Sequence, residues 1–179
     1  MLRFTNFLEE GVNDPSIFKA VFLAGGPGSG KSFMVGKTAL TSFGMKLINS
    51  DPAFEKQLAK AGLKTTPEDI FTDKGQAARS RATALTLKQM ELAVNGRLGL
   101  VIDGTGKNFD KISGQVGKLK QLGYDVAMIF VNTDLDTAIN RDQKRARTLG
   151  AKQVTGMWKD VQKNIGKFQT LFGNMMVIV

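Results

Sequence analysis

Gly25-Gly26-Pro27-Gly28-Ser29-Gly30-Lys31-Ser32 matches the pattern G-x-x-x-x-G-K-[ST] at every fixed position. Residues 20–24, immediately before it, are a short apolar run that predicts a buried strand. Residues 33–43, immediately after it, carry apolar side chains at positions compatible with a helix. A strand, a glycine-rich loop and a helix N-terminus are the context in which this pattern binds phosphate. The structural alternative is a simple glycine-rich turn, and the flanking elements favour the phosphate loop.

The spacing of this motif has a physical reason. Glycine reaches positive φ without a steric penalty, so the loop can turn its N–H groups inward around phosphate oxygens. The helix that follows adds its unpaired N–H groups and the positive end of its dipole. Lys31 is expected to reach the β- and γ-phosphates, and the Ser32 hydroxyl to ligate Mg²⁺. The residues expected to contact the nucleotide are Gly26, Pro27, Gly28, Ser29, Gly30, Lys31, Ser32 and Phe33.

Composition restricts the chemistry. The 179 residues include no cysteine and no histidine, which excludes disulfides and leaves carboxylates or lysines as general bases. The net charge of +9 suits an anionic partner such as a nucleotide or a nucleic acid. The longest apolar run, residues 126–131, is too short to span a bilayer, and the N-terminus lacks a secretory h-region. We therefore expect a cytoplasmic protein with no membrane partner.

Strands alternate with helices along the chain, and each strand is a nearly continuous apolar run. Further strands are predicted at residues 46–49, 98–102, 125–131 and 175–179, and helices at 53–61, 76–95, 108–122, 134–147 and 152–172. This alternation predicts an α/β domain over residues 18–179, with a parallel sheet covered by helices on both faces. Residues 1–17 are predicted to be an amphipathic N-terminal extension.

Two aspartates follow predicted strands, at the sheet edge where ligands bind in such folds. Asp51 is a candidate base that accepts a proton from a substrate hydroxyl, and equally a candidate helix N-cap before Pro52. Asp103 ends an apolar strand, the Walker-B arrangement for holding Mg²⁺, whereas its structural alternative is a turn residue before Gly104.

A basic segment follows the fourth strand. Arg141 and Arg145 are four residues apart, so they project from one face of a helix, where guanidinium groups can stabilise charge on a transferring phosphate. A solvated basic helix is the plain alternative. The position of the pair after a strand and before Gly150 favours a lid over the site.

Four stretches, residues 23–32, 48–51, 101–105 and 141–145, together resemble the P-loop kinases of the polynucleotide 5′-kinase and zeta-toxin group. The resemblance implies a P-loop NTPase three-layer sandwich with a five-stranded parallel sheet in the order 2-3-1-4-5. It also implies ATP, Mg²⁺ and transfer of the γ-phosphate to a hydroxyl, with Asp51 as base and Arg141 and Arg145 as lid arginines. Residues 7–11 separately resemble leader peptides of tailed-phage head proteins, which would place the protein in the host cytoplasm or the virion.

The sequence therefore predicts a kinase with Lys31, Asp51, Arg141 and Arg145 in catalysis. Its basic charge favours a 5′-hydroxyl polynucleotide end as acceptor, and a nucleotide or nucleotide sugar is the second candidate. An ATP-binding structural module of a phage that transfers no phosphate is the alternative from a different class. Residues 54–97 contain no motif that defines the acceptor.

Overall fold

A five-stranded sheet organises the molecule, and its central strand is β1 (Lys19–Ala24), in which all six residues are buried. The computed structural model describes residues 17–144 and 148–179. β1 pairs in parallel with β3 (Leu100–Asp103) and β4 (Asp125–Phe130), while β2 (Lys46–Ile48) and β5 (Met176–Ile178) form the two edges. The order β2-β3-β1-β4-β5 confirms the predicted sheet.

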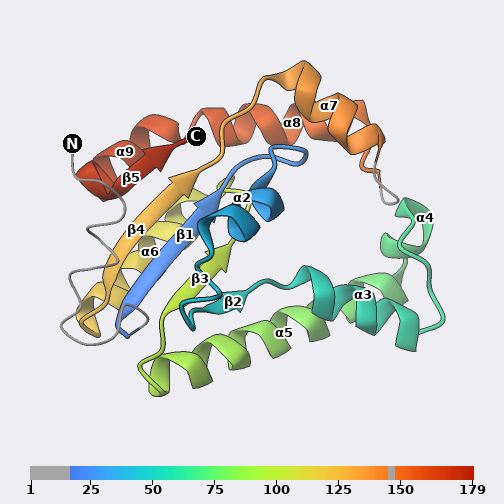
Figure 1. Ribbon diagram of the computed structural model, residues 1–179. Helices are drawn as coiled ribbons and strands as arrows, with labels where there is room; N and C mark the ends of the chain where they lie inside the picture. Colours follow the sequence, from blue (N-terminus) through green and yellow to red (C-terminus); the bar gives the residue numbers. More distant parts are fainter. Residues whose placement is uncertain (1–16, 145–147) are drawn as a thin grey trace.

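Alternate strand residues face two different cores, as the period of two requires. Val21 and Leu23 of β1 belong to a core that packs against Met34 and Val35 of α2 (Lys31–Thr38). Phe22 belongs to the core on the opposite face. The helices that contribute to this second core are α5 (Asp73–Asn95), α6 (Phe109–Gln121), α8 (Ala151–Gln162) and α9 (Ile165–Phe172). Figure 1 shows α2 and α6 on opposite faces of the sheet, which is the three-layer arrangement of P-loop NTPases.

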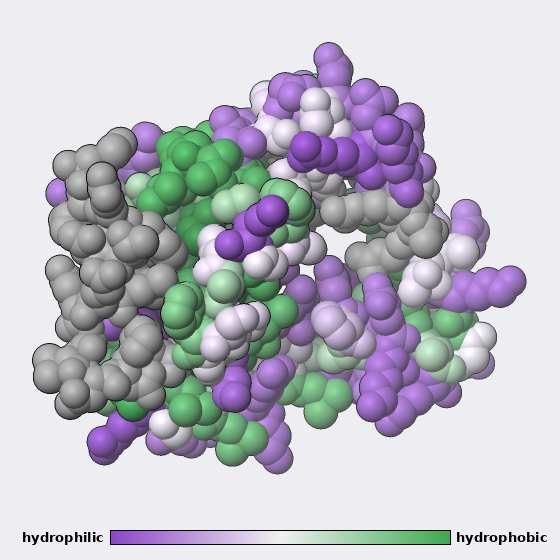
Figure 2. Space-filling model, in the orientation of Figure 1, coloured by the Kyte–Doolittle hydropathy of each residue, from purple (hydrophilic) through white to green (hydrophobic). Residues whose placement is uncertain are grey.

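A third, smaller core lies away from the sheet, in a helical arm that we define as residues 51–82. The arm contains α3 (Asp51–Lys60), α4 (Pro67–Ile70) and the first part of α5. Phe54 and Leu58 are buried there together with Ile70, Ala78 and Ala82, and none of these residues belongs to the two sheet cores. In the space-filling view, most of the visible surface of the arm is hydrophilic, and the surface is hollowed between it and α2 (Figure 2).

Three predicted helices differ from those observed, and one of them, predicted over residues 134–147, ends at Gln143. The helix predicted over residues 33–43 begins at Lys31 and ends at Thr38, because Ala39 adopts a left-handed conformation and the chain turns so that Leu40 is fully buried. The single helix predicted over residues 152–172 is two helices, α8 and α9. They separate around Asn164, a buried residue whose amide donates to the carbonyl oxygens of Gly106 (3.0 Å) and Lys107 (2.9 Å).

The remaining helix, α7 (Leu135–Gln143), begins after Asp134 as predicted, and Asp134 accepts a hydrogen bond from the Thr137 N–H at 2.8 Å. Arg145 lies outside the described residues, as does the predicted N-terminal extension apart from Ile17. Within residues 17–144 and 148–179, no helix is both long enough and apolar enough to cross a membrane.

Candidate functional site

The glycine-rich loop connects β1 to α2 as the motif requires. Gly28 has a φ of +74°, and a Cβ there would collide with the backbone oxygen of Ala138 in α7. Gly30 has a φ of +104° and stands at the N-cap of α2, which begins at Lys31. The Gly25 N–H donates to the Thr105 carbonyl at 3.1 Å, so the loop is attached to the segment that follows β3. The loop therefore needs glycine at Gly25, Gly28 and Gly30, the three positions with positive φ.

Lys31 lies across this loop. Its Nζ donates to the carbonyl oxygens of Gly25 (2.7 Å) and Gly26 (3.2 Å). Ser32 is exposed in the first turn of α2, where its hydroxyl is accessible to a ligand at the loop. The structure thus places both predicted phosphate- and metal-binding side chains at the loop.

α7 packs directly on the other side of the loop. Ala138 contacts Gly28, and Arg141 Nη1 donates to the carbonyl oxygens of Ser29 (3.0 Å) and Gly28 (3.3 Å). The guanidinium group predicted to meet phosphate is therefore held against the phosphate loop, 112 residues away from Ser29 in the chain. α7 contributes this cation because its one buried face, with Ala138 and Asp142, fixes its orientation.

The carboxylates of the site lie at the ends of β2 and β3. The register pairs Ile48 with Ile102, so the next residues, Asn49 and Asp103, come side by side. Asn49 Nδ2 donates to Asp103 Oδ2 at 2.9 Å, and Asn49 Oδ1 accepts from the Asp51 N–H at 2.8 Å. The structure corrects the expectation of Asp51 as an N-cap. Ser50 occupies that position and Asp51 is the first residue of α3, because the turn closed by Asn49 starts the helix one residue earlier than expected.

Burial raises the pKa of Asp103 above its ordinary value of 3.8, while the nearby positive charge of Lys31 lowers this pKa and the negative charge of Asp51 raises it. The causes of the shift show that the phosphate-loop lysine and the second carboxylate both act on Asp103. Three of the predicted site residues therefore share one electrostatic environment, at the carboxyl end of the strands.

The side chains present fit a magnesium ion. Asp103 Oδ1 is buried, and no residue in the described part of the chain hydrogen-bonds to it. Magnesium takes oxygen ligands and commonly uses one or two protein groups, with water and substrate phosphates completing its shell. Asp103 Oδ1 and the Ser32 hydroxyl are two oxygen ligands of this kind. The described residues contain no group of three or more acidic side chains, so a cage built entirely of protein carboxylates does not occur among them.

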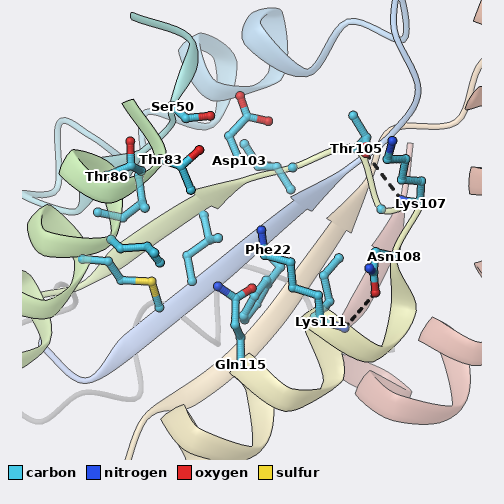
Figure 3. Close-up of a pocket in the computed structure, with 18 residues that line it drawn as sticks. Phe22, Ser50, Thr83, Thr86, Asp103, Thr105, Lys107, Asn108, Lys111 and Gln115 are labelled. Atoms are coloured by element: carbon cyan, nitrogen blue, oxygen red, sulfur yellow. Dashed lines mark hydrogen bonds between the residues drawn. The ribbon is translucent and has the colours of Figure 1, made fainter. Parts of the chain in front are cut away.

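Beside Asp103 a groove of about 350 Å³ runs over the sheet between α5 and α6 (Figure 3). Its floor is apolar and includes Phe22 and Ile102. Figure 3 shows Ser50, Thr83 and Thr86 toward the end where Asp103 lies, with the side chains of the segment after β3 and of α6 on the other side. The polar residues of that second wall are Thr105, Lys107, Asn108, Lys111 and Gln115.

A second hollow, of about 530 Å³, adjoins the phosphate loop on the α7 side. It is lined by Phe33 and Met34 of α2, by Arg141, and by the chain after β4 at residues 131–133. Trp158 supports this chain segment from behind, because its indole N–H donates to the Thr133 carbonyl at 2.8 Å. The Trp158 Cα also lies 3.8 Å from where a Cβ on Gly26 would stand, so the indole residue adjoins the loop itself.

Several site residues were not identified from the sequence. Asn49 lay within a quoted stretch, but its pairing with Asp103 depends on strand register. Thr83 and Thr86 are two residues of a long polar helix and reach the groove only through the packing of α5. A search for polar residues directly after buried strands would have found Asn49, whereas no local signal marks the two threonines.

The model of the AAA domain family matches residues 21–165, which is most of the chain and extends from within β1 to just beyond the end of α8. The chain belongs to the AAA domain family. A search of curated proteins finds no match for this AAA domain.

Solved structures share its fold at low sequence identity. A chain in the structure of the Pnkp1/Rnl/Hen1 RNA repair complex is 16% identical with a TM-score of 0.65, over 89% of this chain and 48% of that one. A chain of the PezAT toxin-antitoxin system of Streptococcus pneumoniae is 14% identical with a TM-score of 0.67, over 98% and 76%. A gluconokinase from Sinorhizobium meliloti 1021 is 15% identical with a TM-score of 0.51, over 92% and 83%. This AAA domain spans about half the length of the RNA-repair chain it matches.

Proposed function

We propose that the protein is an ATP-dependent kinase that transfers the γ-phosphoryl group of ATP to a hydroxyl acceptor. The observation that carries the proposal is that a complete phosphate loop and two carboxylates, Asp51 and Asp103, lie at the same end of the sheet. The fold is shared with structures that include a gluconokinase and an RNA repair complex, which supports a kinase without defining its acceptor.

The nucleotide would bind with its phosphates in the loop of residues 25–32 and its base in the adjoining hollow. The loop N–H groups and Lys31 meet the phosphate oxygens, while Phe33 offers a largely exposed ring for stacking. Ser32 and Asp103 are the side chains that would hold magnesium, which when bound supplies positive charge that offsets the charge of the phosphates.

In the transfer step, the oxygen of the acceptor hydroxyl bonds to the γ-phosphorus. Asp51 accepts the proton that this hydroxyl loses. The bond from the γ-phosphorus to the bridging oxygen breaks, and ADP leaves with that electron pair. Arg141, held at the phosphate loop, stabilises negative charge on the transferring group, and we assign Arg145 the same role. Positioning and electrostatics supply most of the catalysis in reactions of this class, and the chain contains no histidine to act in place of Asp51.

We propose that the acceptor lies in the groove between α5 and α6. A hydroxyl at the Asp103 end would be close to the carboxylates, and Lys107 and Lys111 at the other wall suit an anionic group of the same molecule. A 5′-hydroxyl polynucleotide end meets these conditions and agrees with the net charge of +9.

A nucleotide or nucleotide sugar is the second candidate, and the size of the groove favours it. A volume of about 350 Å³ is at the small end of the range for ligand pockets and encloses one small molecule. Ionic strength distinguishes the two acceptors. Polynucleotide binding weakens steeply as salt rises because many counterions are released, whereas binding of a mononucleotide weakens much less.

The decisive experiment is a screen with γ-³²P-labelled ATP and magnesium over DNA ends, RNA ends, nucleotides, nucleotide sugars and sugars. We expect label on one acceptor class with the wild-type protein and none with Lys31→Ala. Calorimetric titration with ATP provides the matching measurement of binding. Tight ATP binding without label on any acceptor would contradict the kinase and support a nucleotide-binding module.

A further inference from the structure

Asn49 connects the Asp103 carboxylate to the backbone of Asp51, and it has none of the catalytic roles assigned above. It follows β2, the three-residue edge strand, and is half-buried beside Asp103. Its amide donates to Asp103 Oδ2 at 2.9 Å and accepts from the Asp51 N–H at 2.8 Å. One side chain therefore contacts both the metal-side carboxylate and the backbone of the proposed base.

The orientation of this amide is set by its two neighbours. A flipped amide would point its oxygen at the Asp103 carboxylate and its NH₂ group at the Asp51 N–H, and both contacts would be repulsive. With the observed orientation, Asp103 Oδ2 is occupied. The other oxygen, Oδ1, is buried, and among the residues that the structure covers it has no hydrogen-bond partner. Asn49 thus determines which carboxylate oxygen is offered to a ligand.

The same amide determines where α3 begins. The Asn49 side-chain oxygen accepts from the backbone N–H two residues later, in place of the backbone carbonyl of an ordinary turn. Asparagine side chains typically close turns in this way. Asp51 consequently enters the first turn of α3, followed by Pro52, whose fixed φ suits that position. A helix that began elsewhere would present the Asp51 carboxylate in another direction.

We infer that Asn49 is a positioning residue that fixes Asp103 toward the magnesium ion and Asp51 toward the acceptor hydroxyl. The part of this inference that concerns Asp51 rests on the proposed kinase function. The part that concerns Asp103 depends only on metal and nucleotide binding. Groups that orient a metal ligand from behind commonly change metal affinity or activity by about 10- to 100-fold when removed.

Three variants separate the two contacts from a general loss of stability. Asn49→Ala removes both hydrogen bonds. Asn49→Ser keeps a hydroxyl that can accept from the Asp51 N–H but is too short to reach Asp103. Gln89→Ala is the matched control, because Gln89 also ties its amide to β2, at the Leu47 carbonyl (3.4 Å), and does not line the groove.

The first measurement is Mn²⁺ binding in the presence of a non-hydrolysable ATP analogue. The electron paramagnetic resonance signal of free Mn²⁺ reports how much of the ion remains unbound. We expect Asn49→Ala and Asn49→Ser to weaken Mn²⁺ binding by about 10- to 100-fold, and Gln89→Ala to leave it unchanged. Affinity for the analogue without metal should be the same in all four proteins. Mn²⁺ affinity that is unchanged in both Asn49 variants, or that falls equally in Gln89→Ala, would overturn the inference.

The second measurement is the steady-state rate of transfer. Asn49→Ser should recover part of the kcat lost in Asn49→Ala with no change in the KM for ATP, because only the serine can hold the turn before Asp51. Equal kcat values for the two variants would overturn the assignment to Asp51. If the wild-type protein transfers phosphate to no acceptor, the kinase proposal fails, while the Mn²⁺ comparison still decides the role of Asn49 toward Asp103.

Discussion

The proposed nucleotide side and the proposed acceptor side of this molecule are built in different ways. At the phosphate loop, backbone atoms make most contacts: the Gly25 N–H, the Gly28 and Ser29 carbonyls, and the close approach of α7 to Gly28. At the groove, the lining comes from β1, β2, β3, α5, α6 and two loops, and the chain on either side of the helical arm, at Ser50 and Thr83, contributes to it. A site made of backbone groups needs a contiguous sequence motif. A site made of side chains can combine residues from distant segments, and no motif then marks it in the sequence.

The sharpest test of this difference is a change that stops transfer and leaves nucleotide binding intact. Asp51→Asn keeps the shape of the side chain and removes its ability to accept a proton. We expect kcat to fall by about 10²- to 10⁴-fold, the usual contribution of a general base, while calorimetric ATP affinity stays the same. Glu55→Gln, one turn further along α3, is the control. Transfer at the wild-type rate in Asp51→Asn would remove Asp51 from the mechanism.

A glycine substitution should break the nucleotide side. Gly28→Ala forces a Cβ onto a residue with φ of +74° and into the backbone of Ala138. We expect the free energy of unfolding to fall by about 1–3 kcal/mol and ATP binding to be lost in calorimetry. Gly36→Ala, inside α2 with open space around it, should instead raise stability by about 0.5–1 kcal/mol. Wild-type ATP affinity in Gly28→Ala would contradict the described loop.

The corresponding change on the acceptor side is Gly75→Ala. A Cβ at Gly75 would collide with the backbone oxygens of Asp69 and Ile70, where α4 meets α5. We expect a loss of about 1–3 kcal/mol, with faster hydrogen exchange confined to residues 51–82. ATP binding should remain, because the arm core shares no residue with the sheet cores. Gly114→Ala in α6, where nothing crowds the site, is the control, and a loss of ATP binding in Gly75→Ala alone would show that the two regions are coupled.

The smallest expected effect concerns Asp134, the cap of α7. Hydrogen bonds from Thr137 lower the pKa of Asp134 below its ordinary value of 3.8. The folded state therefore favours the charged form, and this contribution is present above pH 3.8 and disappears as the pH falls through the lowered pKa. Asp134→Asn keeps a good cap without the charge. Its thermal unfolding midpoint should lie slightly below that of the wild type at pH 7, and the difference should shrink on acidification. A difference that grows on acidification would contradict the assignment.

Much of the nucleotide side could be predicted from the sequence, for a physical reason. Residues 25–32 leave few alternatives to a phosphate loop, and the apolar runs before and after it define a parallel sheet. The helix that carries Arg141 was also predicted to follow the fourth strand, whereas the contact of Arg141 with the Gly28 and Ser29 carbonyls was found only in the structure. The kinase activity and the roles of Asp51, Arg141 and Arg145 remain predictions.

The acceptor side was less predictable because its contacts join distant residues. Asn164 was placed inside a continuous helix, since no glycine or proline marks a break between residues 157 and 165. Its amide satisfies the Gly106 and Lys107 carbonyls, 58 and 57 residues earlier, and these long-range contacts favour the kink. The contact of Asn49 with Asp103 likewise follows only from the register of β2 and β3.

The chain contains one tryptophan, and Trp158 adjoins Gly26 of the phosphate loop while its indole N–H is bonded to Thr133. Indole emission depends on the polarity and motion of its surroundings, and all of the protein's tryptophan fluorescence originates beside the proposed nucleotide pocket. The molecule therefore contains a built-in optical reporter, with which ATP association could be followed in real time without any attached dye.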